Sequence, residues 1–203
     1  AMLSAGLTYV IILGGIDISV GSVAALAGVI AAMVGRQFQD MGVFMSLIIL
    51  VGSALVVGGI CGALNGLMIT KFRVVPMIAT LAMQTIARGL CFIFSGGTAV
   101  SGLPQAFSWL GAGRWLKTEA KATGWIPNIT IFVVLGVALM AILRGKTVFG
   151  RHVDATGSNL QVAHLSGINT NRVTFLSHVL CSVAAALAGV LNASKLQNGQ
   201  PAA

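Results

Sequence analysis

The residues able to do chemistry in this 203-residue chain are few, and the first is a carboxylate, Asp17. It is the only acid within the apolar stretches and lies in residues 14–22, which read Gly-Gly-Ile-Asp-Ile-Ser-Val-Gly-Ser. Paired glycines weaken a helix, and Asp17 or Ser19 can accept from the free N–H groups that begin the next helix. An ionisable group in such a stretch is a functional hypothesis by default. Two interpretations stay open: a polar group on a solute path at a broken helix, and a helix cap.

A second polar group comprises Thr80, Gln84 and Arg88, spaced i, i+4 and i+8 in the apolar stretch 76–94. This spacing puts the three side chains on one helix face. At 1.5 Å rise per residue, Arg88 lies about 18 Å along the helix from Pro76, more than halfway across a membrane. Three polar groups on one face favour a polar interior over lipid. They suit a sugar path, and they also suit plain packing of a helix bundle.

Two apparent catalytic motifs fail on inspection. Gly145-Lys146-Thr147 resembles the end of a P-loop, but the earlier glycine that this motif requires is replaced by Met140. Ser177 and His178 are adjacent, yet no acid follows nearby, and neighbouring side chains on a helix do not face each other. We therefore predict no catalytic residue and no ATP binding by this chain.

The cysteines do not suggest a cofactor. Cys61, Cys91 and Cys181 lie far apart in apolar stretches, with no Cys-x-x-Cys pair and no histidine at ligand spacing. Small apolar packing residues are the simplest interpretation. No metal and no other cofactor is predicted.

The polar loop 144–174 carries a third pattern. Ser158 or Asn159 can cap a short helix that Gly167 ends in a left-handed turn. Leu160 and Ala163 then share one face of that helix, with His164 beside them. A short helix over 158–167, with an apolar face and basic surroundings, is predicted to dock on a partner. A helix lying on lipid headgroups is the alternative.

The composition of the chain indicates which kind of protein carries these polar residues. The chain is 57% hydrophobic and 8% charged, whereas soluble domains are about 25% charged. The net charge of +8 is spread thinly and aromatics are few, which excludes a typical nucleic-acid interface and suits anionic lipid headgroups. The chain opens at Ala1 inside an apolar stretch, without the features of a signal peptide, and we expect its natural beginning to be missing.

Apolar stretches of membrane-spanning length recur along the chain. The candidates are 1–16, 20–35, 43–70, 76–94, 126–143 and 175–193. They are too long for strands and lack the alternation of a barrel. We predict an all-α, polytopic transmembrane bundle of about five to six apolar helical segments, one of them broken near Asp17, forming a single domain over 1–203.

The number of spans between two loops predicts whether they share a side of the membrane, because an even number of spans returns the chain to the same side. Lys71, Arg73 and loop 144–174 fall on one side, and Arg36, segment 95–125 and the tail from Lys195 fall on the other. The two sides hold six and five Lys/Arg, so the positive-inside rule barely orients the chain.

Small residues recur at four-residue spacing on three helix faces, which predicts close helix packing and equally suits a sliding interface. The three stripes are Gly58, Gly62 and Gly66; Ala24, Gly28 and Ala32; and Cys181, Ala185, Gly189 and Ala193.

Residues 14–22 resemble the signature of bacterial ribose-type sugar permeases, the membrane subunits of ATP-binding-cassette importers. Two further regions agree in order: 75–97, with Val-Pro-Met-Ile-Ala-Thr-Leu and Ser-Gly-Gly, and 150–201, with Gly-Ser-Asn, Leu-Ser-Gly-Ile-Asn and Gly-Gln-Pro. Members of that family are typically over a hundred residues longer, so we expect a fragment. They also commonly carry an acid where this chain has Leu160 and Gln161.

The resemblance implies a multi-pass protein of the bacterial inner membrane that imports a simple sugar. It implies a cytoplasmic ATPase docking on loop 144–174, a periplasmic sugar-binding protein, and a second permease copy in a homodimer or heterodimer. Within this picture the substrate path is expected at Asp17, Asn65, Thr80, Gln84 and Arg88. The ATPase-coupling residues are expected to be Asn159, Leu160, Ala163, Leu165 and Gly167.

Two other functions stay open. A permease for another small nutrient, such as a branched-chain amino acid, belongs to the same class. An ion-driven secondary transporter needs no ATPase, but it would be expected to hold more acids inside the membrane than Asp17 alone.

Overall fold

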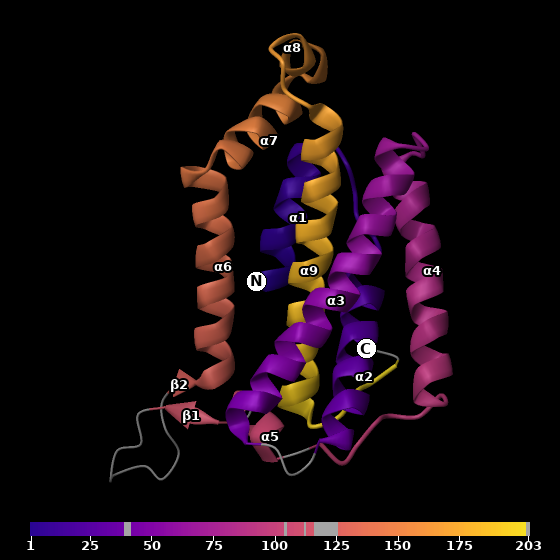
Figure 1. Cartoon of the computed structure of the whole chain (residues 1–203), viewed down its shortest axis with the longest axis vertical. Helices are drawn as coiled ribbons and strands as arrows, with labels where there is room; N and C mark the ends of the chain where they lie inside the picture. The colour runs from indigo at the N-terminus through magenta and orange to yellow at the C-terminus, as the bar shows by residue number, and fades with distance from the viewer. Residues whose placement is uncertain (39–41, 104, 112, 116–125, 202–203) are drawn as a thin grey trace.

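Long apolar stretches have become long helices in the computed structural model, which describes residues 1–38, 42–103, 105–111, 113–115 and 126–201. Within these ranges the elements in chain order are α1 (Met2–Ile12), α2 (Val20–Gln37), α3 (Val43–Thr70), α4 (Pro76–Ser95), α5 (Gln105–Gly111), β1 (Arg114–Trp115), β2 (Ile126–Pro127), α6 (Asn128–Lys146), α7 (Val148–Ser158), α8 (Leu160–Leu165) and α9 (Thr170–Leu196). The two short strands pair antiparallel. The all-α prediction is confirmed (Figure 1).

Helix α9 is the centre of the bundle and packs directly against α1, α2 and α3. Glycines make the closest of these approaches. A Cβ added at Gly62 would lie 2.6 Å from the Cα of Val179, and one at Gly58 would lie 2.7 Å from the carbonyl oxygen of Ser182. The predicted stripe on α3 is therefore a backbone-to-backbone contact with α9, as small-residue faces permit.

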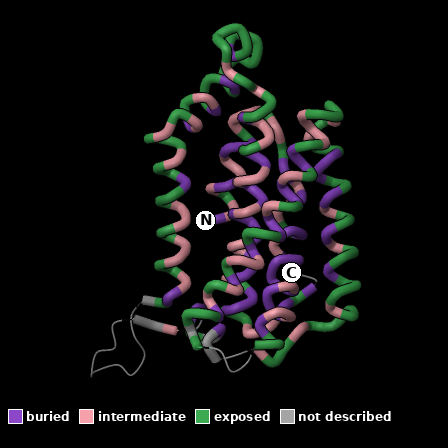
Figure 2. The backbone as a smooth tube through the Cα atoms, viewed as in Figure 1, coloured by how far each residue is buried: buried purple, intermediate pink, exposed green. Residues whose placement is uncertain are grey.

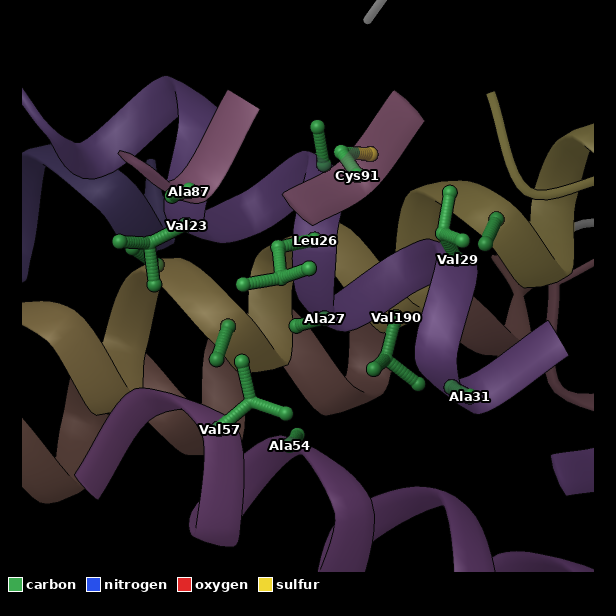
Figure 3. Packing of buried hydrophobic residues seen from close by; sticks show 14 of the residues in the cluster. Val23, Leu26, Ala27, Val29, Ala31, Ala54, Val57, Ala87, Cys91 and Val190 are labelled. Carbon is green, nitrogen blue, oxygen red and sulfur yellow. The ribbon is translucent and has the colours of Figure 1, made fainter. Parts of the chain in front are cut away.

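The other two stripes meet each other. A Cβ added at Gly28 of α2 would lie 3.1 Å from the carbonyl oxygen of Gly189, and one added at Gly189 would collide with the backbone of Ala24. Around this contact, small and branched apolar side chains of α2, α3, α4 and α9 fill the core, including Val23, Val57 and Val190 (Figure 3). Close packing and core filling thus use the same helix faces.

The first predicted span is shorter than its apolar stretch. Helix α1 ends at Ile12, Gly14 adopts a left-handed φ of 74°, and α2 begins only at Val20. The connecting residues 13–19 run back along the bundle before α2 starts (Figure 1). The predicted helix break near Asp17 is confirmed, and it places non-helical backbone inside the bundle, which membranes tolerate only where protein surrounds it.

Five helices of the described chain are long and apolar enough to cross a membrane, namely α2, α3, α4, α6 and α9, and α1 is a shorter apolar helix. Many residues of α3, α4 and α6 are exposed (Figure 2), and large apolar residues are frequent among them. An exposed apolar belt of this kind suits hydrocarbon. The prediction of five to six apolar segments is confirmed.

The two ends of the bundle separate the loops as parity predicted. The turn after α3, with Lys71 and Arg73, lies at the same end as α7 and α8 (Figure 1). The last turn of α2 with Arg36, the described parts of 95–125 and the end of α9 lie at the opposite end.

Candidate functional site

Asp17 lies in a polar cluster that crosses the helix break. The residue is 3% exposed, and its Oδ1 accepts hydrogen bonds from the backbone N–H of Ser19 at 2.9 Å and from the Ser19 hydroxyl at 2.6 Å. Ser19 is the residue before α2, and its own side chain makes no capping bond. Asp17 therefore stabilises a turn directly before α2. The side chains of Asp17 and Ser19 do not cap α2, which differs from the helix-cap interpretation.

Three other elements join this cluster. The amide nitrogen of Asn65 on α3 donates to the Ser19 hydroxyl at 3.0 Å, and Nδ1 of His178 on α9 lies 3.9 Å from Oδ2 of Asp17. The Thr80 hydroxyl on α4 lies 2.9 Å from the carbonyl oxygen of Pro76 and 3.3 Å from that of Ile16. We call Asp17, Ser19, Asn65, Thr80 and His178 the Asp17 junction. It links segment 13–19 to α3, α4 and α9.

The junction is deeply placed and incompletely bonded. His178 lies eight residues into α9, which is about 12 Å from the helix start. All five junction residues are buried, and Oδ2 of Asp17, Oδ1 of Asn65 and Nδ1 of His178 have no hydrogen-bond partner. Buried polar atoms without partners cost free energy, so these atoms point to a function or a bound species.

His178 was missed by the sequence reasoning, which found no acid near it. The acid is Asp17, which lies far away in the sequence, in the segment between α1 and α2. The available signal was electrostatic: an acid and a base placed singly in apolar stretches are expected to pair. The rejection of a Ser177–His178 pair stands, because the Ser177 hydroxyl is buried without a hydrogen-bond partner.

Gln84 and Arg88 lie apart from the junction. On α4 the side chains of Met83, Ala87 and Cys91 are buried, and Gln84 and Arg88 flank them, half-buried. Thr80 is fully buried on the same face. The predicted shared face is confirmed, but the structure brings only Asp17, Asn65 and Thr80 of the five predicted path residues together.

The other predicted site is the projection formed by α7 and α8. Asn159 begins α8, and its side-chain oxygen accepts from the N–H groups of Gln161 and Val162 at 3.0 Å each. Gly167 follows the helix with φ 82°. The predicted cap and stop are confirmed, although α8 is shorter than 158–167.

The faces of α8 differ from the prediction. Ala163 is 3% exposed, whereas Leu160 and Leu165 are 58% and 86% exposed. Ala163 is held inside the projection, and its carbonyl oxygen accepts from the N–H of Ile168 at 3.1 Å. Leu160 and Ala163 thus differ in exposure, and their contact with a partner stays a prediction. Leu160, Val162 and Leu165 form the exposed apolar surface of α8, which we call the α8 tip.

The described residues do not bring three His, Cys, Asp or Glu side chains together as metal ligands would come together. Cys61, Cys91 and Cys181 are buried free thiols.

Comparisons with known proteins agree with this architecture. The family described as branched-chain amino acid transport system / permease component matches residues 1–203. The ribose import permease protein RbsC of Escherichia coli (strain K12) is 34% identical over 100% of this chain and 60% of its own length. RbsC of Bacillus subtilis (strain 168) is 37% identical over 100% of this chain and 59% of its own length.

A third relative is the L-arabinose ABC transporter permease protein AraH of Azospirillum brasilense, 35% identical over 95% of this chain and 53% of its own length. The chain thus spans about 60% of the length of the first curated relatives it matches. No solved structure matches the chain. With a family match along its full length and five helices able to cross a membrane, the chain belongs to the branched-chain amino acid transport system permease component family, as a multi-pass protein of the inner membrane.

Proposed function

We propose that this chain is the core of the permease subunit of an ATP-binding-cassette importer for a simple sugar of the ribose type. The observation that carries the proposal is the identity of 34–37% to sugar permeases over the whole chain. The polytopic bundle supports it, because five helices of the described chain are long and apolar enough to cross a membrane. ATP hydrolysis would belong to a separate subunit.

The α8 tip is our proposed docking site for that ATPase. It projects beyond the bundle at the end where α6 and α9 meet α7 (Figure 1). Leu160, Val162 and Leu165 have no partner within the described chain that covers them, and small interfaces gain most from apolar anchors seated in a cleft. Asn159 and Gly167 hold the helix ends, and buried Ala163 supports the tip from below. The end of the bundle that carries α8 is then cytoplasmic.

Gln84 and Arg88 are our proposed path residues. They line the edge of the buried face of α4, where a polar group avoids full exposure to lipid. Asp17 and Asn65 both bond Ser19, the Thr80 hydroxyl bonds the carbonyl oxygen of Ile16, and all three residues are buried in this conformation. A sugar reaches them only if segment 13–19 moves. A second permease copy against the exposed apolar face of α4, and a periplasmic sugar-binding protein at the end opposite α8, complete the proposed assembly.

The test is ATP-driven uptake by the full-length protein in proteoliposomes with its ATPase and binding protein. Labelled ribose, arabinose and leucine would be supplied separately, with and without ATP. We expect ATP-dependent uptake of a sugar and none of leucine. Uptake of leucine alone would replace the proposal with an amino-acid permease, and uptake driven by an ion gradient without ATP would replace it with a secondary transporter.

A further inference from the structure

Helix α7 lies against the end of α1, directly before the helix break. A Cβ added at Gly157 of α7 would lie 2.3 Å from the carbonyl oxygen of Ile12 and 2.7 Å from its Cγ2 atom. Because Ile12 is the last residue of α1, the next residue along the chain already belongs to segment 13–19. The backbone of α7 thus lies in close contact with the residue from which the non-helical segment starts.

Buried apolar side chains extend this contact between α7 and α1. Val153 of α7 is fully buried in the same cluster as Tyr9 of α1, and Ile12 and Phe149 pack against that cluster. The rings of Tyr9 and Phe149 are stacked, with their centroids 6.1 Å apart. We call Tyr9, Ile12, Phe149, Val153 and Gly157 the α7 seat.

The other attachments of α7 are made to the regular parts of long helices. Arg144 of α6 pairs with Asp154 of α7 at 3.2 Å, but the two side chains are 45% and 50% exposed. An ion pair with that exposure adds little stability. Helix α7 also packs against α9, which is a continuous helix. At the α7 seat the neighbour is a helix terminus followed by non-helical backbone, and such positions absorb conformational change more easily than a helix interior does.

The α7 seat is also close to the α8 tip along the chain. Only Ser158 and Asn159 separate Gly157 from Leu160, the first residue of α8 (Figure 1). The N–H of Asn159 donates to the carbonyl oxygen of Ala155 at 3.2 Å, and the Asn159 side chain caps α8. Helix α8 therefore follows α7 without a flexible linker, and a displacement of the α8 tip displaces Gly157 with it.

We propose that the α7 seat is the contact through which a displacement of the α8 tip moves segment 13–19, with Gly157 as its positioning residue. Asp17 follows Ile12 by five residues, so a shift of the end of α1 reaches the Asp17 junction through non-helical backbone. The proposal rests on the proposed docking of an ATPase at the α8 tip. It assigns the transmission to α1 rather than to α6 or α9.

The first test is amide hydrogen exchange of segment 13–19 in the full-length permease alone, in mild detergent. The N–H groups of Gly14 and Gly15 donate to carbonyl oxygens of the last turn of α1, so their exchange requires opening of the break. Gly157→Ala places a methyl group against the backbone of Ile12, and we expect exchange in segment 13–19 to accelerate by about tenfold.

The matched control is Gly145→Ala, at the same end of the bundle on α6. A Cβ added at Gly145 meets nothing within 4 Å in the described part of the chain. This variant should keep the wild-type exchange of segment 13–19.

A second pair of variants keeps the test decisive if Gly157→Ala does not fold. Val153→Ala removes two methyl groups from the α7 seat, and Val190→Ala removes the same groups from the buried core shown in Figure 3. Val153→Ala should accelerate exchange in segment 13–19 by about tenfold, and Val190→Ala should leave it unchanged. Wild-type exchange of this segment in Val153→Ala, and in Gly157→Ala where that variant folds, would overturn the proposal.

The second test measures transmission in proteoliposomes that contain the ATPase and the binding protein. Gly157→Ala, or Val153→Ala in its place, should keep ATPase association, because the α8 tip is unchanged. Sugar uptake per ATP hydrolysed should fall by about tenfold, whereas Gly145→Ala should keep the wild-type ratio. A wild-type ratio together with accelerated exchange would overturn the transmitting role. A wild type without ATP-driven uptake would overturn the proposed function, while the exchange result still decides whether α7 holds the break.

Discussion

Single residues in this protein divide into polar groups sealed inside the bundle and polar groups at the edge of a helix face. Asp17, Asn65 and Thr80 are sealed, and Asn65 and Thr80 both contact segment 13–19, which carries Asp17. Gln84 and Arg88 are half-buried at the edge of α4. Because a charge facing hydrocarbon is costly, we propose that Arg88 contributes to the solute path.

We expect Arg88→Leu to lower uptake by the full-length protein by about tenfold or more, because a charged hydrogen bond contributes about 1.5–3 kcal/mol. The amount of folded protein in the membrane should change much less. Arg88→Lys keeps the charge but loses the planar five-donor group, and should give intermediate uptake. Uptake of labelled sugar, normalised to folded protein by gel filtration, is the measurement. Wild-type uptake in the Leu variant would remove Arg88 from the path.

At the scale of single residues, the sequence predicted which residues share a helix face better than which residues of different elements contact each other. Helical spacing placed Thr80, Gln84 and Arg88 on one face, because that geometry is local. The pairing of Asp17 with His178 depends on how α9 packs against the helix break, which no local pattern encodes. The inward direction of Ala163 was missed for a similar reason, since a six-residue helix has no second turn to reveal its buried face.

At the scale of the elements, the contact between α3 and α9 is made at glycines, which have no side chain to hold the two helices apart. Gly58 and Gly62 meet the backbone of α9, whereas Gly59 has open space around its Cα. The three glycines share one helix, and an alanine at any of them gains the same helix propensity. Their substitution therefore isolates the cost of the close contact.

We expect Gly62→Ala to lower the stability of the full-length protein by about 1–3 kcal/mol, since its Cβ meets backbone that cannot move aside easily. Gly59→Ala should be neutral or slightly stabilising. Melting temperatures in detergent, with the folded fraction from gel filtration, provide the comparison. Equal Tm values for the two variants would show that α3 and α9 are not in close contact.

Element positions were predictable where hydrophobicity alone decides them. Spans 43–70 and 76–94 were placed within a residue, because long apolar helices have few alternatives in a membrane. Helix α7 was missed, because Gly150 and Gly157 weaken its intrinsic helix propensity. Burial of Gly150, Val153 and Thr156 stabilises it through tertiary packing.

The two ends of the bundle differ in structure. The α8 end carries the α7–α8 projection, and the other end carries α5 and the strand pair (Figure 1). The order of the spans in the sequence predicted which loops lie at each end, because every span takes the chain from one end of the bundle to the other. The sequence does not predict which end is cytoplasmic, because the two sides hold nearly equal numbers of Lys/Arg, six and five.

We expect single cysteines at Ser101 and Ser158, in a background without Cys61, Cys91 and Cys181, to be labelled from opposite sides. Both positions are exposed. Ser158 is the last residue of α7 and Ser101 lies between α4 and α5, and α7 and α5 are at opposite ends of the bundle (Figure 1). An impermeant thiol reagent applied to intact and to opened spheroplasts distinguishes the sides, and Ser158→Cys should react only after opening. Labelling of both from the same side would contradict the topology.

The most direct test of the proposed function is whether the α8 tip binds the ATPase. Leu165 is 86% exposed, so Leu165→Glu should leave insertion and folding unchanged. In an apolar cleft of the ATPase the added carboxylate would be unpaired, at a cost of several kcal/mol. Phe38→Glu, the same kind of change at the opposite end, is the control.

The measurement is co-purification of the ATPase with the full-length permease in mild detergent, with ATP hydrolysis stimulated by the sugar-loaded binding protein. We predict normal membrane levels for both variants, loss of ATPase association and of stimulated hydrolysis in Leu165→Glu, and wild-type association in Phe38→Glu. Full ATPase binding and stimulation in Leu165→Glu would contradict the account and make α8 a helix that lies on the membrane surface.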